Sequence, residues 1–167
     1  MKRYNRVLCG ILAVCLMVVL ITVQVSAAGY AWVRLFSGFQ TLSPGCGNTY
    51  AGYTKPLQMF LECYDSGWST DIMNAGGVDG DYGDVTATCL GKYKIAKSLK
   101  LDKVCDASTW GCVGGDLNAV AYGDYMYFSY GSGDIIRANN SFPVKFQYYY
   151  LQNGNTALSG VFHTAYS

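Results

Sequence analysis

The sequence predicts an all-β domain, a small antiparallel β-sandwich of about six to eight strands, preceded by an N-terminal signal helix. Residues 28–167 contain short runs rich in aromatic and β-branched residues, separated by Gly and Asn, with no long stretch of helical periodicity. An Asn-Gly dipeptide inside "QNGN" (152–155) separates the last two runs. Because Asn-Gly is the strongest short hairpin signal, we expect these two strands to be antiparallel neighbours.

The N-terminus has the layout of a secretory signal peptide. Three basic residues within 1–6 precede an apolar run, and Val25-Ser26-Ala27 supplies the compact residues of a cleavage site. We expect cleavage after Ala27, leaving residues 28–167 as a single secreted β-sandwich domain. A retained anchor is the alternative, since the run approaches the ~20 apolar residues that span a bilayer. Contact with a membrane is expected only through such an uncleaved segment.

Each predicted strand follows from a local pattern. Two early runs are predicted as strands because apolar residues occupy every second position. This spacing places Leu57, Met59 and Leu61 on one face of the first strand, and Val85, Ala87 and Cys89 on one face of the second. A later run begins at Pro143, where the missing N–H of proline costs least. The expected strands lie within residues 30–40, 57–64, 84–96, 121–130, 143–152 and 157–166.

The charge balance excludes one class of partner. Three of the twelve Lys and Arg residues lie within 1–27. Residues 28–167 therefore contain nine basic and eleven acidic residues, which gives them a net charge of −2. This domain has no basic field with which to hold nucleic acid.

Five cysteines follow the signal segment, an odd number, and export to an oxidising compartment favours disulfides. Cys105 and Cys112 enclose a short turn-forming loop and form the first predicted pair. Cys63 and Cys89 lie on apolar strand faces and form the second, which leaves Cys46 as the odd thiol. A zinc site is disfavoured because the chain has no C-x-x-C motif and only one histidine.

The stretch "GGVDGDYGDV" (76–85) concentrates carboxylates among glycines. Asp79, Asp81 and Asp84 could supply oxygen ligands to calcium, the one cofactor that the sequence suggests. The EF-hand pattern fails, because Leu90 stands where the bidentate Glu belongs. A plain turn is the first interpretation, since Gly-Asp turns are common without metal, and a looser calcium loop is the alternative.

Few residues are suited to catalysis. Glu62 is the only glutamate and His163 the only histidine, and the chain has no G-x-S-x-G, H-E-x-x-H or P-loop motif. We therefore expect no enzyme and no catalytic residue. A small secreted hydrolase using Cys46, or an aspartate, together with His163 is one alternative. A secreted bacteriocin-like antagonistic protein is another.

Aromatic residues are in surplus, with fourteen of the fifteen tyrosines beyond residue 27. Such side chains stack on sugar rings and make adaptable contacts with proteins. Three consecutive tyrosines cannot all point to one side of a strand, so part of this aromatic surface must face outward. The sequence thus favours a secreted, non-enzymatic domain that binds an extracellular glycan, cell wall or protein surface. Its candidate binding residues are Trp68, Trp110, Tyr148, Tyr149 and Tyr150.

Overall fold

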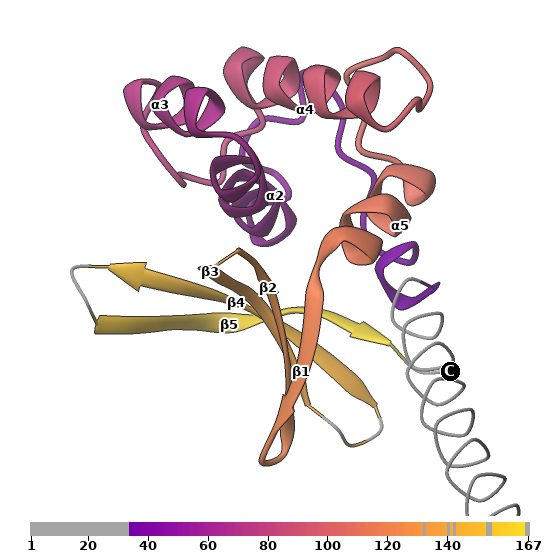
Figure 1. Ribbon diagram of the computed structural model, residues 1–167, viewed down its shortest axis with the longest axis vertical. Helices are drawn as coiled ribbons and strands as arrows, with labels where there is room; N and C mark the ends of the chain where they lie inside the picture. The colour runs from indigo at the N-terminus through magenta and orange to yellow at the C-terminus, as the bar shows by residue number, and fades with distance from the viewer. Residues whose placement is uncertain (1–33, 132, 140, 142, 153–154, 166–167) are drawn as a thin grey trace, which may run out of the picture. The chain divides into compact units, whose positions relative to one another are not determined.

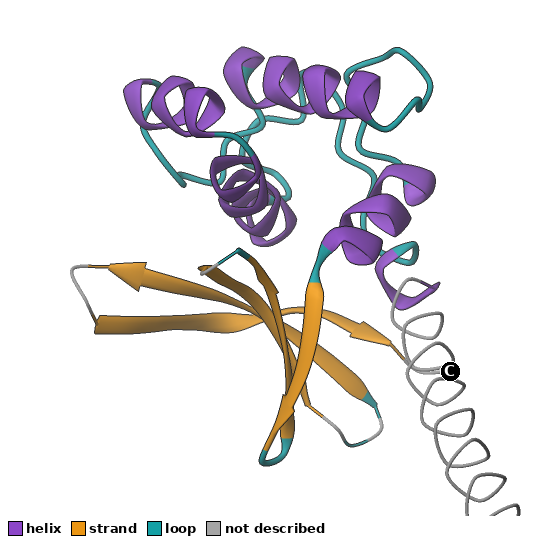
Figure 2. Ribbon diagram, viewed as in Figure 1, coloured by secondary structure: helices purple, strands orange, loops and turns teal. Residues whose placement is uncertain are grey.

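The prediction of an all-β sandwich is wrong. A computed structural model describes residues 34–131, 133–139, 141, 143–152 and 155–165, and in it a helical half precedes a single antiparallel sheet (Figures 1 and 2). The helices are α2 (Ala51–Tyr64), α3 (Ser66–Asn74), α4 (Asp84–Ala96) and α5 (Ala107–Asp116). The strands are β1 (Asn118–Tyr122), β2 (Tyr125–Tyr130), β3 (Gly133–Asn139), β4 (Val144–Gln152) and β5 (Asn155–Ala165). The predicted signal peptide, residues 1–27, lies outside the described residues.

The five strands form a meander in the order β1-β2-β3-β4-β5, with every neighbouring pair antiparallel. The runs predicted at 121–130, 143–152 and 157–166 do contain strands. The hairpin predicted at "QNGN" is confirmed, because Gln152 pairs with Asn155 across the β4–β5 connection.

The runs at 57–64 and 84–96 are helical because their apolar residues also follow a period of 3.6. In α4 the buried residues are Thr86, Ala87, Cys89, Leu90, Tyr93 and Lys94. Thr86, Leu90 and Tyr93 are separated by four and three residues, the spacing of one helix face. Ile95, which would share the inward face with Cys89 if this run were a strand, is instead exposed. Asp84 in the first turn and Lys94 in the last also complement the helix dipole.

Aspartates begin two of the helices. The Asp65 side chain accepts hydrogen bonds from the backbone N–H groups of Gly67 and Trp68 at the start of α3. Asp106 accepts from the backbone N–H of Thr109 at the start of α5. Each carboxylate satisfies donors that the first turn of a helix leaves unpaired.

The hydrophobic core joins the helices to one face of the sheet. The Phe36 ring packs edge-on against Phe128 of β2 at 5.1 Å and Phe146 of β4 at 5.7 Å. The Phe39 ring contacts Phe146 at 4.9 Å and Trp110 of α5 at 5.2 Å. All five rings are buried, and α2 covers the same side of the sheet (Figure 2). The strands therefore have an inner face, which carries Phe128 and Phe146, and an outer face.

The connection from α4 to α5 is held by a buried lysine. The Lys94 side chain is 0% exposed; its ammonium pairs with the Asp102 carboxylate and donates to the Val104 carbonyl at 2.7 Å. Asp102 also accepts from Lys100 at 3.0 Å and from the Val104 backbone N–H at 3.1 Å. The hydrogen bonds from Lys94, Lys100 and Val104 hold the pKa of Asp102 well below its ordinary value.

None of the helices in the described part of the chain has the length and hydropathy needed to cross a membrane.

We expect Asp102→Asn to lower the melting temperature at pH 7 by roughly 5 to 10 °C, because the buried Lys94 ammonium loses its counter-charge. A carboxylate whose pKa is lowered by folding stabilises the folded protein at pH values above its pKa in the unfolded chain, about 3.9. This stabilisation is lost as the pH falls toward the pKa of the carboxylate in the folded protein. The difference between wild type and variant should therefore shrink below about pH 4.

Thermal unfolding followed by circular dichroism from pH 7 to pH 2 measures this effect. Asp71→Asn is the matched control, because Asp71 forms an exposed ion pair with Lys92 at 3.4 Å and its loss should change little. Equal melting temperatures for wild type and Asp102→Asn at pH 7 would contradict the account of Lys94.

Candidate functional site

The outer face of the sheet carries a row of residues that crosses four strands. The register pairs Val120 of β1 with Tyr127 of β2. Tyr127 in turn pairs with Arg137 of β3, and Arg137 with Gln147 of β4. Because directly paired residues lie on the same face, all four point away from the buried Phe128 and Phe146. A second row begins with the paired Tyr122 and Tyr125.

Contacts between side chains join these rows into one surface. The Tyr127 ring lies 6.5 Å from the Tyr122 ring and 6.4 Å from the Tyr125 ring, with the ring planes inclined at 66° and 62°. The Arg137 guanidinium lies 4.2 Å from the centre of the Tyr125 ring, and its Nε donates to Gln147 Oε1 at 2.8 Å. We call this surface the tyrosine face; its residues are Val120, Tyr122, Tyr125, Tyr127, Arg137 and Gln147.

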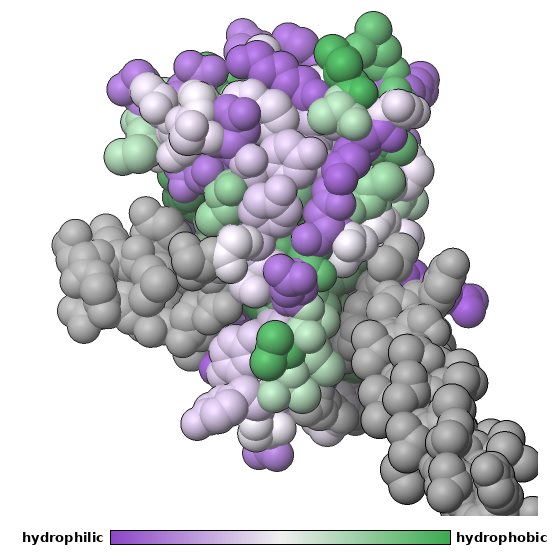
Figure 3. Space-filling view, in the orientation of Figure 1, coloured by the Kyte–Doolittle hydropathy of each residue, from purple (hydrophilic) through white to green (hydrophobic). Residues whose placement is uncertain are grey.

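The tyrosine face is open to solvent at the β1 end. Tyr122 is 78% exposed and Val120 is 58% exposed, while Tyr125 and Tyr127 are half-buried. Figure 3 shows apolar and weakly polar residues gathered over the β1–β2 hairpin, below the helices. None of the described helices packs against this side of the sheet (Figure 1). Half-exposed tyrosines with an ordered guanidinium among them combine apolar contact area with hydrogen-bond donors.

The predicted aromatic binding residues are not brought together. Trp110 lies within the segment predicted as a turn-forming loop between Cys105 and Cys112, but residues 107–116 form α5 and Trp110 is 0% exposed. Its Nε1 donates to the Gln40 carbonyl at 2.9 Å. Trp68 is half-buried in α3, stacked on Tyr64 at 5.3 Å. Tyr148 contacts Phe162 and Lys55 on the inner side of the sheet. The backbones of Tyr149 and Tyr150 belong to β4, but their side chains lie outside the described ones.

The sequence contains a pattern that indicates the outward orientation of two residues of the tyrosine face. In "YMYFSY" (125–130), Tyr125 and Tyr127 alternate with Met126 and Phe128, so an amphipathic strand was readable there. Arg137 carried no such signal, because its role depends on the pairing of β3 with β2.

The predicted disulfides are absent, because all five cysteines in the described residues are free. The loop expected between Cys105 and Cys112 is largely the helix α5, so no tight turn joins them. Cys63 lies in the last turn of α2 and is exposed, whereas Cys89 is buried in α4. The two facing strands on which the second pair depended do not exist.

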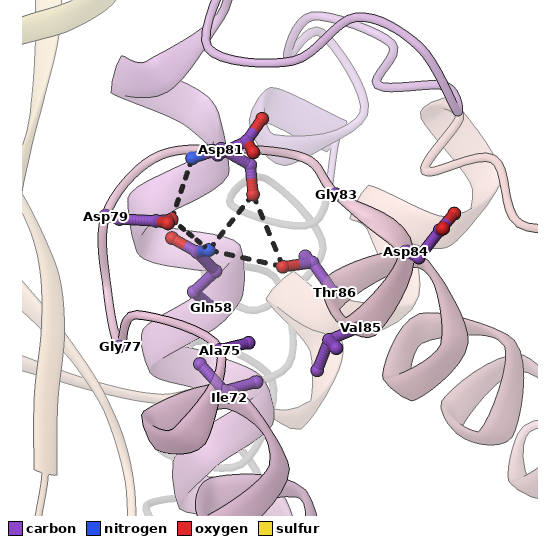
Figure 4. A pocket seen from close by; sticks show the side chains of 10 residues that line it. All are labelled: Gln58, Ile72, Ala75, Gly77, Asp79, Asp81, Gly83, Asp84, Val85 and Thr86. Carbon is purple, nitrogen blue, oxygen red and sulfur yellow. Dashed lines mark hydrogen bonds between the residues drawn. The ribbon is translucent and has the colours of Figure 1, made fainter.

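The aspartate loop between α3 and α4 is fixed by a glutamine (Figure 4). Gln58 of α2 is 2% exposed; its Nε2 donates to Asp79 Oδ1 at 2.8 Å and to the Asp81 carbonyl at 3.2 Å. Its Oε1 accepts from the buried backbone N–H of Gly80 at 2.9 Å. Asp79 Oδ1 also accepts from the Asp81 backbone N–H at 2.8 Å, which is the turn chemistry of aspartate.

The loop borders a hollow of about 230 Å³, but its geometry does not support the alternative interpretation as a calcium loop. The Asp84 side chain points away from Asp79 and Asp81 in Figure 4. Among the described residues, no three His, Cys, Asp or Glu side chains form a group that could hold a metal ion. The carboxylate of Asp79 instead serves to order its own loop.

Cys46 and His163, the pair named in the hydrolase alternative, have different hydrogen-bond partners. His163 Nδ1 is 3.1 Å from the Tyr53 hydroxyl, and its ring packs 4.9 Å from the Phe39 ring. Burial lowers the pKa of His163, which favours the neutral ring. The Cys46 thiol contacts the carbonyl of its neighbour Gly47, and no hydrogen bond joins it to His163.

Comparisons with protein-family models, with curated proteins and with solved structures found no match.

We expect Gln58→Met to lower the free energy of unfolding by about 2–3 kcal/mol, because it leaves the buried Gly80 N–H without its acceptor. Urea unfolding measures the loss, and hydrogen exchange at the Gly80 amide should accelerate. Gln40→Met is the control: Gln40 is exposed and makes one long bond to Thr41, so its change should stay within about 0.5 kcal/mol. A Gly80 amide that stays protected in Gln58→Met would contradict this assignment.

Proposed function

We propose that the chain is a secreted, non-enzymatic binding domain whose tyrosine face binds a glycan of a cell wall or another extracellular surface. The observation that carries the proposal is the grouping of three tyrosines from two adjacent strands around Arg137 on the outer face of the sheet. Outer faces of antiparallel sheets are ordinarily polar, so a cluster of aromatic rings there needs a reason.

The chemistry of the face favours a sugar over an apolar protein partner. Only Val120 of its six residues is aliphatic, and it lies on the edge strand. Tyrosine rings offer flat apolar area to the C–H face of a sugar, while their hydroxyls remain polar. The Arg137 guanidinium and the Gln147 amide are planar hydrogen-bonding groups, which suit neighbouring hydroxyls on one ring. Secretion is supported by the N-terminal sequence pattern alone.

The absence of enzyme activity is part of the proposal. It is supported by the different partners of Cys46 and His163, since Cys46 contacts the Gly47 carbonyl and His163 lies against the Tyr53 hydroxyl. Burial raises the pKa of the Cys89 and Cys105 thiols, so neither is poised as a thiolate nucleophile.

We expect the wild-type chain to be retained on insoluble cell-wall polysaccharide, and Tyr127→Ala to weaken retention about two- to tenfold. One aromatic stack contributes ~0.5–1.5 kcal/mol, and 1.4 kcal/mol corresponds to a factor of ten. Tyr122→Ala should also weaken it, and Arg137→Lys should do so through loss of the planar donor set. Depletion binding on washed polysaccharide measures each variant.

Two further variants make the test specific. Tyr50→Ala replaces a half-buried tyrosine at the start of α2 and should leave retention unchanged. Trp68→Ala tests the sequence-based choice of Trp68. Loss of retention in Trp68→Ala with normal retention in Tyr127→Ala would move the site to α3, and no retention of wild type on any glycan would remove the proposal.

A further inference from the structure

Strand β1 is an edge strand without the usual protection. It lies at the end of the sheet order and pairs only with β2, in an uninterrupted register. All five of its residues, "NAVAY", are exposed. The strand contains no charged residue, no proline and no bulge, the devices by which natural edge strands avoid pairing with other chains. Its free edge is therefore a template for another strand.

We infer that β1 pairs antiparallel with β1 of a second copy of this chain, about a two-fold axis at Val120. This inference goes beyond the proposed function and does not depend on it. In that register Val120 lies opposite Val120 of the other copy, Ala119 opposite Ala121, and Asn118 opposite Tyr122.

The register satisfies the geometry of an antiparallel ladder. In such a ladder, alternate residues direct their N–H and C=O groups to the same side of the strand. In the proposed register, each residue of β1 lies opposite a residue whose number differs from its own by zero, two or four. Residues that direct their N–H and C=O groups toward the free edge of one strand therefore face residues that do the same in the other, and the two can form hydrogen bonds. The same parity keeps Val120 and Tyr122 of both copies on one face.

A second copy suits this edge better than a charged peptide does. Because β1 contains no charged side chain, the pairing places no like charges opposite one another within the strand, and small alanines face each other beside the central valines. The paired sheets would place the two tyrosine faces side by side. A five-residue strand buries less than a standard interface, so we expect a weak dimer with a dissociation constant in the micromolar range.

The test uses the full 167-residue chain without ligand and exploits the symmetry at Val120. Val120→Lys and Val120→Glu each place like charges opposite one another, so each variant alone should dimerise at least tenfold more weakly. An equimolar mixture of the two should recover the association as a heterodimer, because Lys then faces Glu. Sedimentation velocity over about 1–100 μM measures the dissociation constants.

The mixture distinguishes pairing at β1 from association through any other part of the chain, and its recovery also shows that both variants fold. Met73→Lys is the control, because it places a lysine at another exposed apolar position, 67% exposed on α3, and should not change dimerisation. A wild-type chain that stays monomeric at 100 μM would overturn the inference. So would single variants that dimerise normally, or a mixture that fails to recover.

Discussion

Ring packing around Phe36 and Phe39 determines which side of the sheet is available for function. These two buried residues lie between α5, through Trp110, and the inner face of the sheet, through Phe128 and Phe146. The contact is close enough that a Cβ at Gly114 of α5 would lie 2.8 Å from the Phe36 ring. Because strand residues alternate between faces, burial of Phe128 directs Tyr127 and Tyr125 outward.

The helical half supports this arrangement through buried polar contacts. Gln58 connects α2 to the loop before α4, and Lys94 connects α4 to the segment before α5. Both side chains are almost completely buried and fully bonded, and no buried side-chain polar atom of the described residues lacks a partner. Such contacts fix the connections between helices, so α2 and α5 meet the sheet in one way. The outer face then has only its own side chains to organise it.

The second half of the fold could be predicted from the sequence and the first half could not. The aromatic-rich runs at 121–130 and 143–152 and the Asn-Gly turn are local signals, and the strands they predict are present. The alternation of apolar residues at Leu57, Met59 and Leu61 led to the wrong prediction of a strand. Nearly every residue in the middle turns of α2 is buried, so the apolar pattern fits both the two-residue period of a strand and the 3.6-residue period of a helix. Asp65 and Asp106 are helix caps that could have corrected the interpretation. The grouping of Arg137 with Tyr125 depends on strand pairing, which the sequence does not specify.

Chemical-shift mapping of the tyrosine and tryptophan rings during titration with a soluble cell-wall oligosaccharide tests the central claim most directly. The account predicts shifts of the Tyr122, Tyr125 and Tyr127 ring signals, with the buried Trp110 and Tyr93 rings unchanged. It also predicts a shift at the Arg137 Nε–H, which lies beside Tyr125. Shifts confined to Trp68 and Tyr64, with the three outer tyrosines unaffected, would contradict the claim that the sheet's outer face is the binding surface.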